Sequence, residues 1–156
     1  CELSLRTTKD GIRMFAKPIA EIEKLRKKTY TIAAKPLPQD QSCSTSASGM
    51  LFDMRVNFDV GTAERVIISA NGLNITYDAI EKTLNGRPLE PEDGKISIQA
   101  VVDNSIMEIA GNDGRILLHV PHGHSIAVDE FRITAHGGDA HLNSFEAHEL
   151  NSIWGN

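Results

Sequence analysis

Three histidines lie close together at His119, His122 and His124. Imidazole nitrogens are good ligands for Zn²⁺, so this segment is the first place to look for chemistry. Pro121 and Gly123 interrupt it, however, and the sequence contains no His-Glu-x-x-His motif. We therefore predict a turn with exposed imidazoles at these positions and no functional metal site.

Carboxylates are the second candidate, because glycoside hydrolysis uses a protonated acid and a second carboxylate about 5–10 Å away. Several acidic residues occupy alternating positions that we expect to point outward, namely Asp53, Asp59 and Glu64, where solvated charges belong. The chain has no Gly-x-Ser-x-Gly elbow, P-loop or dinucleotide-binding glycine motif. We predict no catalytic residue, no cofactor-binding residue, no cofactor and no metal ligand.

Aromatic side chains are scarce, at 5% of the residues, and Trp154 is the single tryptophan. Rings that stack on sugars need an exposed platform, which so few aromatic residues do not provide. We expect Trp154 to anchor the last strand by packing. Asn74-Ile75-Thr76 fits the N-glycosylation sequon, whose use depends on the host.

Length and composition predict one globular domain with an attached arm. The chain has 156 residues, of which 40% are hydrophobic, and this excludes a disordered chain. No apolar run reaches the ~20 residues of a membrane helix, so no membrane is expected. The first six residues lack the pattern of a signal peptide.

Charge and cysteine content exclude other classes. The net charge is −5, which is unsuited to nucleic acid, and the one tight basic run, residues 26–28, is expected to be the solvated end of a helix. Cys1 and Cys43 make neither a disulfide framework nor a four-cysteine zinc site. Whether they pair, and in which redox compartment, stays open.

The chain is expected to open with a β-hairpin and a helix. Residues 2–8 and 12–17 alternate around an Asp-Gly turn, with Phe15 on the face opposite Ile12 and Met14. Ile19, Ile22 and Leu25 then follow helical spacing, which predicts one short helix near residues 19–28.

The remaining residues predict many short strands and therefore an all-β fold, a two-sheet antiparallel β-sandwich of the jelly-roll or concanavalin-like type. Residues 50–60 give the clearest alternation, residues 39–48 are expected to be a mobile loop, and residues 112–114 to be a hairpin turn. Further strands are expected at residues 29–34, 66–68, 73–77, 96–102, 105–109, 115–120, 125–135 and 141–154. The predicted core comprises Phe52, Met54, Val56, Phe58, Ile96, Ile98, Ile109, Leu117 and Phe131.

Several ordered stretches resemble one family. They are Glu-Leu-Ser-Leu-Arg at residues 2–6, Gly-Ile-Arg-Met at 11–14, Lys-Pro-Ile-x-Glu-Ile-Glu-x-Leu-Arg at 17–26, Ile-Thr-Tyr-Asp-Ala at 75–79, Asp-Gly-Lys-Ile at 93–96, Val-Asp-Asn-Ser-Ile-Met-Glu-Ile at 102–109, Gly-Asn-Asp-Gly at 111–114 and Leu-Asn-Ser-Ile-Trp at 150–154. Together they resemble the domain junction and the C-terminal β-sandwich of glycoside hydrolase family 32, the invertases, levanases and inulinases.

This resemblance implies a module separated from its catalytic five-bladed propeller. The family's nucleophile lies in Trp-Met-Asn-Asp-Pro-Asn-Gly, its stabilising Asp in Arg-Asp-Pro and its acid in Glu-Cys, and none of these motifs occurs here. Residues 1–28 would then be a connecting hairpin and short helix from the missing catalytic domain, and residues 29–156 the β-sandwich domain. Asn112-Asp113-Gly114 shares letters with the nucleophile motif but sits in a predicted turn.

The function that the resemblance implies is non-catalytic: the module would pack on the propeller of the same parent protein and stabilise it. Two alternatives remain, a fructan-binding module and an oligomerisation module that forms a homodimer. Low aromatic content favours the first function over fructan binding. The parent would be a fructosidase, and the family favours an extracellular or periplasmic location.

Overall fold

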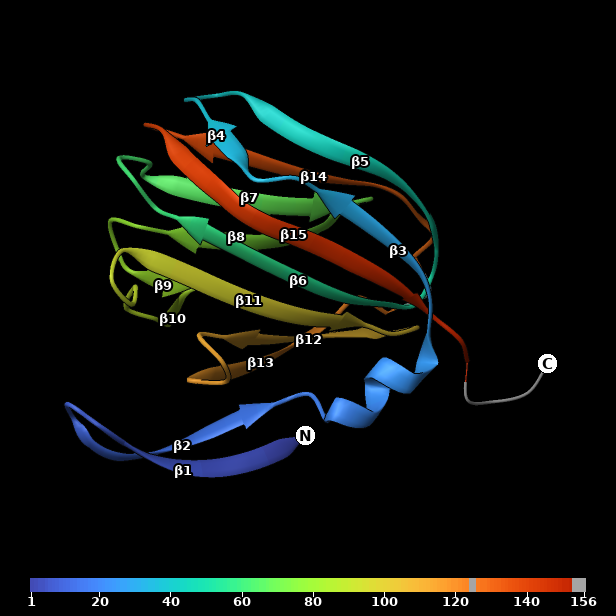
Figure 1. The fold of residues 1–156 in the computed structure, drawn as a ribbon, viewed down its shortest axis with the longest axis horizontal. Coiled ribbons are helices and arrows are strands. Elements are labelled where there is room, and N and C mark those ends of the chain that lie inside the picture. The colour runs from blue at the N-terminus through green and yellow to red at the C-terminus, as the bar shows by residue number, and fades with distance from the viewer. Residues whose placement is uncertain (124–125, 153–156) are drawn as a thin grey trace.

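Two antiparallel β-sheets lie face to face, and a separate β-hairpin stands beside them in the computed structural model (Figure 1). The structure describes residues 1–123 and 126–152. The predicted all-β, antiparallel sandwich with very little helix is confirmed. Strands that alternate apolar and polar residues require this arrangement, because each sheet must bury one face against a partner.

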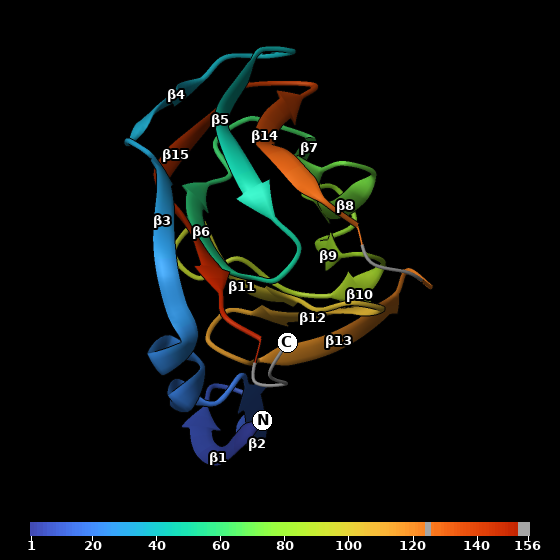
Figure 2. The ribbon, with the colours of Figure 1, turned by 90° about the vertical axis from the view of Figure 1, so that its right-hand side faces the viewer.

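The hairpin at the N-terminus consists of β1 (Glu2–Thr8) and β2 (Gly11–Lys17). A short 3₁₀-helix, η1 (Ala20–Leu25), links it to the sandwich. Figures 1 and 2 both place the hairpin next to β13, at one edge of the sandwich.

The larger sheet has seven strands, and the last strand of the chain lies inside it. Strand β15 is paired with β6 on one side and with β3 and β4 on the other. In spatial order the strands are β13 (Ile116–Pro121), β12 (Ile106–Gly111), β11 (Lys95–Val102), β6 (Phe52–Asp59), β15 (Ala140–Leu150) and β3 (Arg26–Ile32), with β4 (Lys35–Leu37) off this path.

The smaller sheet has six strands and covers the inner face of the first. Its spatial order is β10 (Arg87–Pro88), β9 (Thr83–Leu84), β8 (Leu73–Asp78), β7 (Arg65–Ala70), β14 (Val128–His136) and β5 (Ser42–Gly49).

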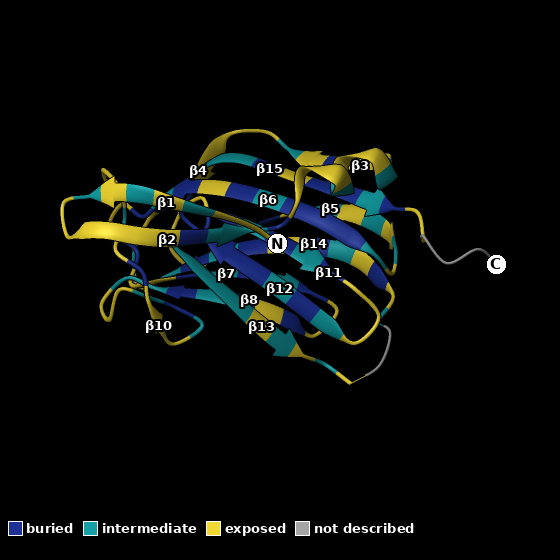
Figure 3. Ribbon diagram, turned by 90° about the horizontal axis from the view of Figure 1, so that it is seen from below, coloured by how far each residue is buried: buried dark blue, intermediate teal, exposed yellow. Residues whose placement is uncertain are grey.

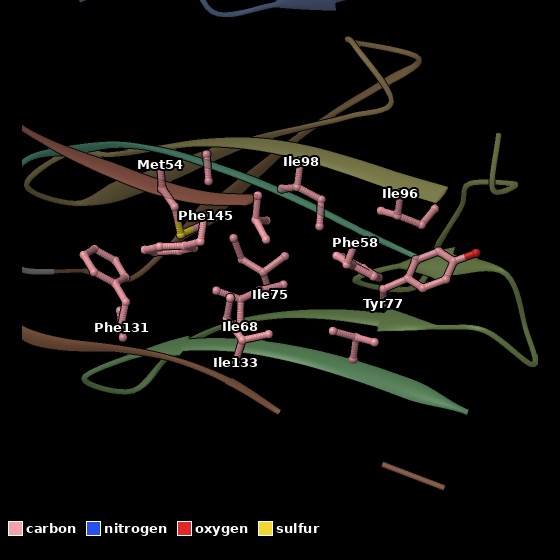
Figure 4. Packing of buried hydrophobic residues seen from close by; sticks show 14 of the residues in the cluster. Met54, Phe58, Ile68, Ile75, Tyr77, Ile96, Ile98, Phe131, Ile133 and Phe145 are labelled. Atoms are coloured by element: carbon pink, nitrogen blue, oxygen red, sulfur yellow. The ribbon is translucent and has the colours of Figure 1, made fainter. Parts of the chain in front are cut away.

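Aromatic and aliphatic side chains from both sheets fill the space between them (Figure 4). Phe131 meets Phe52 edge-on at 5.1 Å between ring centroids and lies 5.4 Å from Phe145. The Tyr77 hydroxyl donates a hydrogen bond to the carbonyl of Leu89, and burial raises the pKa of Tyr77 to about 12. These contacts show an apolar core in which even the phenol has its polar atom paired.

Eight of the nine predicted core residues are buried, and Leu117 is the error. Its neighbours Ile116 and Leu118 pack against the core, whereas Leu117 is half-exposed. Side chains alternate along a strand, so Leu117 shares the outer face with its cross-strand partner Ala110. Because Ile116, Leu117 and Leu118 are all apolar, the alternation of side chains does not show which of them face the core. The prediction for Leu117 therefore chose the wrong face of the strand.

The prediction of a mobile loop at residues 39–48 is also wrong, because most of this segment belongs to strand β5. Cys43 is buried and Thr45 is half-buried, while Ser44 and Ser46 are exposed. The alternation uses small residues and serines, so hydrophobicity does not reveal it. Pairing with β14 makes this segment a strand.

The predicted helix is shorter than expected and is a 3₁₀-helix. Ile19, Ile22 and Leu25 recur every three residues, which matches three residues per turn better than 3.6. Arg26 already has extended backbone angles and pairs with Leu150, so the basic run belongs to β3 and not to a helix end.

Candidate interdomain interface

One face of the hairpin exposes a row of large apolar side chains. Its members are Leu3, Leu5, Ile12 and Met14, with 59%, 75%, 67% and 61% of their surface exposed. Register brings them together, because Leu5 pairs with Met14 and the side chains alternate between faces. Figure 3 shows this hairpin as mostly exposed or intermediate, whereas the strands of the sandwich carry many buried residues. We call these four residues the hairpin face; such a contiguous apolar patch is typical of an interaction site.

The opposite side of the hairpin contacts the sandwich through Phe15, which is buried, as expected from its position opposite Ile12 and Met14. The Arg6 guanidinium lies 4.4 Å from the centre of the Phe15 ring, and that of Arg115 lies 5.8 Å from it. Cation–π contacts therefore tie the ring to both the hairpin and the sandwich.

Asp113 holds the same side of the hairpin by charge. Arg6 Nη1 lies 2.6 Å and Lys17 Nζ 3.3 Å from its carboxylate oxygens. Burial by itself would raise the pKa of Asp113, but the hydrogen bonds from Arg6 and Lys17 outweigh it and the pKa lies below the usual range. The Ala16 amide also donates to the Gly114 carbonyl at 2.9 Å. The predicted turn at residues 112–114 is confirmed, and it anchors the hairpin.

Where the linker joins the sandwich, Asp53 is fully buried, contrary to the expectation of a solvated charge. Arg26 donates to its Oδ2 from Nε at 3.1 Å and from Nη2 at 2.5 Å. Gln99 Nε2 donates to Oδ1 at 2.8 Å. The side chains of Arg26 and Gln99 cover the Asp53 carboxylate. Asp53 is therefore buried although it lies on the outer face of the sheet.

Glu23 extends this cluster onto η1. Its Oε1 lies 2.7 Å from Nη2 of Arg55 and 3.4 Å from Nη2 of Arg26. The hydrogen bond from Arg55, followed by the charge of Arg26, lowers the pKa of Glu23. Arg55 Nη2 also lies 3.7 Å from Asp53 Oδ2. The four charged residues Glu23, Arg26, Asp53 and Arg55 form what we call the linker cluster.

His148 lies beside the linker cluster, paired across strands with Asp53. Its Nδ1 shares a 2.9 Å hydrogen bond with the Thr29 hydroxyl, and its Nε2 lies 3.4 Å from Glu146 Oε2. Burial, followed by the positive charge of Arg26, lowers the pKa of His148. The neutral imidazole therefore prevails near neutral pH.

Two further predicted carboxylates do not join a site. Glu64 is exposed, as expected, and Asp59 is half-buried and accepts a hydrogen bond from Asn143. Within residues 1–123 and 126–152, no three His, Cys, Asp or Glu side chains are arranged to hold a metal ion.

The histidine segment is only partly described. His119 is exposed, with Nε2 3.3 Å from Glu108 Oε1, and the His122 amide donates to the Ser105 carbonyl at 2.9 Å. His124 and Trp154 lie outside the described residues.

The remaining sequence features are placed as follows. Cys1 is exposed and Cys43 is buried, both as free thiols, and Asn74 of the sequon is exposed on β8. No helix in the described part of the chain is long and apolar enough to cross a membrane.

The fold is an antiparallel β-sandwich joined through a short 3₁₀-helix to a β-hairpin with an exposed apolar face. The sequence model "Glycosyl hydrolases family 32 C terminal" matches residues 21–149, and the chain belongs to this family.

Among curated relatives, a levanase of Bacillus sp. (strain L7) is 25% identical over 98% of this chain and 20% of that protein. A levanase of Bacillus subtilis (strain 168) is 24% identical over 99% of this chain and 27% of that protein. The chain thus spans about a quarter or less of these relatives' length.

Solved structures share the fold. The exo-inulinase of Aspergillus awamori matches with a TM-score of 0.79 and 17% identity, over 97% of this chain and 35% of that one. The β-fructofuranosidase of Schwanniomyces occidentalis matches with a TM-score of 0.70 and 16% identity, over 96% of this chain and 39% of that one.

Proposed function

We propose that this chain is the non-catalytic C-terminal module of a longer fructan- or sucrose-hydrolysing enzyme, and that it packs against the catalytic domain through the hairpin face. In this proposal residues 1–28 form the connection, whose last three residues are already the start of β3, which pairs with β15, and residues 29–156 form the sandwich domain. The single observation that carries this proposal is the exposed row of Leu3, Leu5, Ile12 and Met14 on an element otherwise fixed to the sandwich.

Two other observations support the proposal. The curated relatives that the chain matches end to end are levanases, and it covers only 20% and 27% of them. Its own sequence contains none of the three propeller motifs that carry the family's nucleophile, stabilising Asp and acid. The chemistry of the parent protein would then be done by another domain.

The test is titration calorimetry of this chain with the separately expressed catalytic domain of its parent protein. Leu5→Asp with Met14→Asp should weaken binding at least about tenfold, because each buried apolar side chain contributes roughly 1.5–3 kcal/mol. Ile80→Asp is the matched control, since Ile80 is 66% exposed and follows β8 of the smaller sheet, outside the hairpin face. Equal affinity of the Leu5/Met14 variant and the control would refute docking through the hairpin face.

Sedimentation of the chain alone separates this proposal from self-association. A partner-free hairpin face is expected to give at most weak, concentration-dependent dimers. A tight dimer that the two substitutions abolish and that excludes the catalytic domain would favour an oligomerisation module instead.

A further inference from the structure

The hairpin face is attached to the sandwich at two separate places. Asp113, Phe15 and Gly114 hold the hairpin itself near the β12–β13 turn. The linker cluster holds η1 and the start of β3 at the other place. A cleft of about 310 Å³ between the linker and the sheet is lined by residues from both, including Pro18, Ala20, Asn57 and Ser97. The two attachments, which lie beside this cleft, determine how the hairpin is oriented relative to the sandwich.

Apolar packing does little to hold η1 in place. No residue of this 3₁₀-helix is buried, and Ile22 and Leu25 are only half-buried. A single six-residue 3₁₀ segment has poor hydrogen-bond geometry and little stability of its own. Some other interaction must fix its orientation.

The linker cluster has the geometry to do this. Arg26 contacts a single carboxylate oxygen of Asp53 through two nitrogens, and Gln99 occupies the other oxygen. Guanidinium–carboxylate hydrogen bonds are directional, so they fix an angle as well as a distance. Moving Arg26 away would leave the buried Asp53 carboxylate with Gln99 and the longer 3.7 Å contact to Arg55 alone, which is unfavourable for a buried charge. The linker therefore has one favoured position.

We propose that the linker cluster is an orientation lock: Glu23 on η1 and Arg26, which directly follows η1 as the first residue of β3, engage Asp53 and Arg55 on β6, and this sets the direction in which the hairpin face is presented. The role of the lock in presenting the hairpin face rests on the proposed docking function. The fixed orientation of the linker does not depend on docking and can be measured in this chain alone. It pre-organises the interface, so that less conformational entropy is lost on docking.

Distance measurements between two spin labels test the lock in the chain alone. One label goes on Cys1, which is exposed at the start of the hairpin, and the other on Ser46→Cys on β5. Cys43 is buried, and burial raises the pKa of its thiol, so it is protected from labelling. The parent chain should give one narrow distance distribution. Asp53→Asn should broaden it at least about twofold.

Amide exchange gives a second readout at the lock itself. The Arg26 amide donates to the Glu23 carbonyl and the Ile22 amide to that of Ile19. Asp53→Asn should speed their exchange at least about tenfold, while core amides of β7 and β14 keep their rates, because only the linker opens locally.

Glu23→Gln serves as a second variant should Asp53→Asn fail to fold, since Glu23 lies on the exposed side of the cluster. It should broaden the distribution in the same direction and by less. Glu90→Gln is the matched control: it removes an exposed ion pair with Lys82, 2.8 Å apart, and should change neither readout.

An unchanged distribution and unchanged linker exchange in a folded Asp53→Asn chain would overturn the lock, even if the melting temperature falls. Equal docking affinity of the Leu5/Met14 variant and its Ile80→Asp control, with the lock intact, would instead refute the hairpin face, so the two proposals fail separately.

Discussion

Phe58 shows how strongly single side chains hold the sandwich together. Its ring is fully buried and lies 6.1 Å from that of Tyr77. Phe58→Ala should lower the free energy of unfolding by about 3–5 kcal/mol, because it removes the ring and leaves a cavity. Urea denaturation measures this change. Ile80→Ala, at an exposed position, is the control, and an equal effect of both variants would mean that Phe58 does not support the core.

His148 gives a prediction in the physiological pH range. Burial and Arg26 lower the pKa of its imidazole, so nuclear magnetic resonance should find it below 6.5. A lowered folded-state pKa means that the histidine contributes stability above pH 6.5, and that this contribution is lost as the pH falls through the folded value. Arg26→Gln should raise the His148 pKa, because a positive charge is removed. A pKa at or above 6.5 in the parent chain would contradict this assignment.

Asp53 marks the limit of prediction at the level of residues. Alternation correctly placed it on the outer face of β6, opposite Phe52 and Met54. The burial of Asp53 could not be inferred, because the residues that cover its carboxylate come from the start of β3 and from β11. The sequence predicts on which face of a strand a residue lies, but tertiary contacts decide whether other side chains cover that residue.

Among the elements, the hairpin and the central strands were predictable, whereas the edge strand β5 was not. Strands β1, β2, β6 and β11 alternate apolar and polar residues and are bounded by recognisable turns. Their own residues are therefore enough to predict them. Strand β5 contains mostly small polar residues and is a strand because β14 supplies hydrogen-bond partners. That pairing is long-range and leaves little trace in local composition.

Removal of the hairpin tests its independence from the core. A chain lacking residues 1–17 should keep a cooperative β-sheet transition, since the core cluster contains no hairpin residue. The melting temperature should fall by no more than about 4 °C, the shift that a loss of roughly 1 kcal/mol produces in a domain of about 150 residues. Circular dichroism follows this. Loss of the transition would show that the hairpin is an integral part of the sandwich.

For the molecule as a whole, we predict that the chain alone hydrolyses nothing. Hydrolysis with retention needs a carboxylate nucleophile and a carboxylic acid on either side of one glycosidic bond. Hydrogen bonds and neighbouring cations lower the pKa values of several carboxyl groups in the described part of the chain, among them Glu23, Asp78 and Glu130. A lowered pKa disfavours the protonated state that an acid catalyst requires.

The assay is release of reducing sugar from sucrose, inulin and levan by purified chain. No turnover above buffer is expected. Sustained turnover that survives repurification and is lost on substitution of one Asp or Glu would require an active site within these residues.

The position of β15 has a consequence for biosynthesis. Thr29 on β3 meets His148 on β15 across 119 residues of chain, and β15 separates β3 from β6. A nascent polypeptide leaving the ribosome therefore exposes the edges of β3 and β6 until Leu150 has emerged. Such unpaired strand edges invite aggregation. A premature stop codon before Ala140 is therefore expected to yield insoluble product.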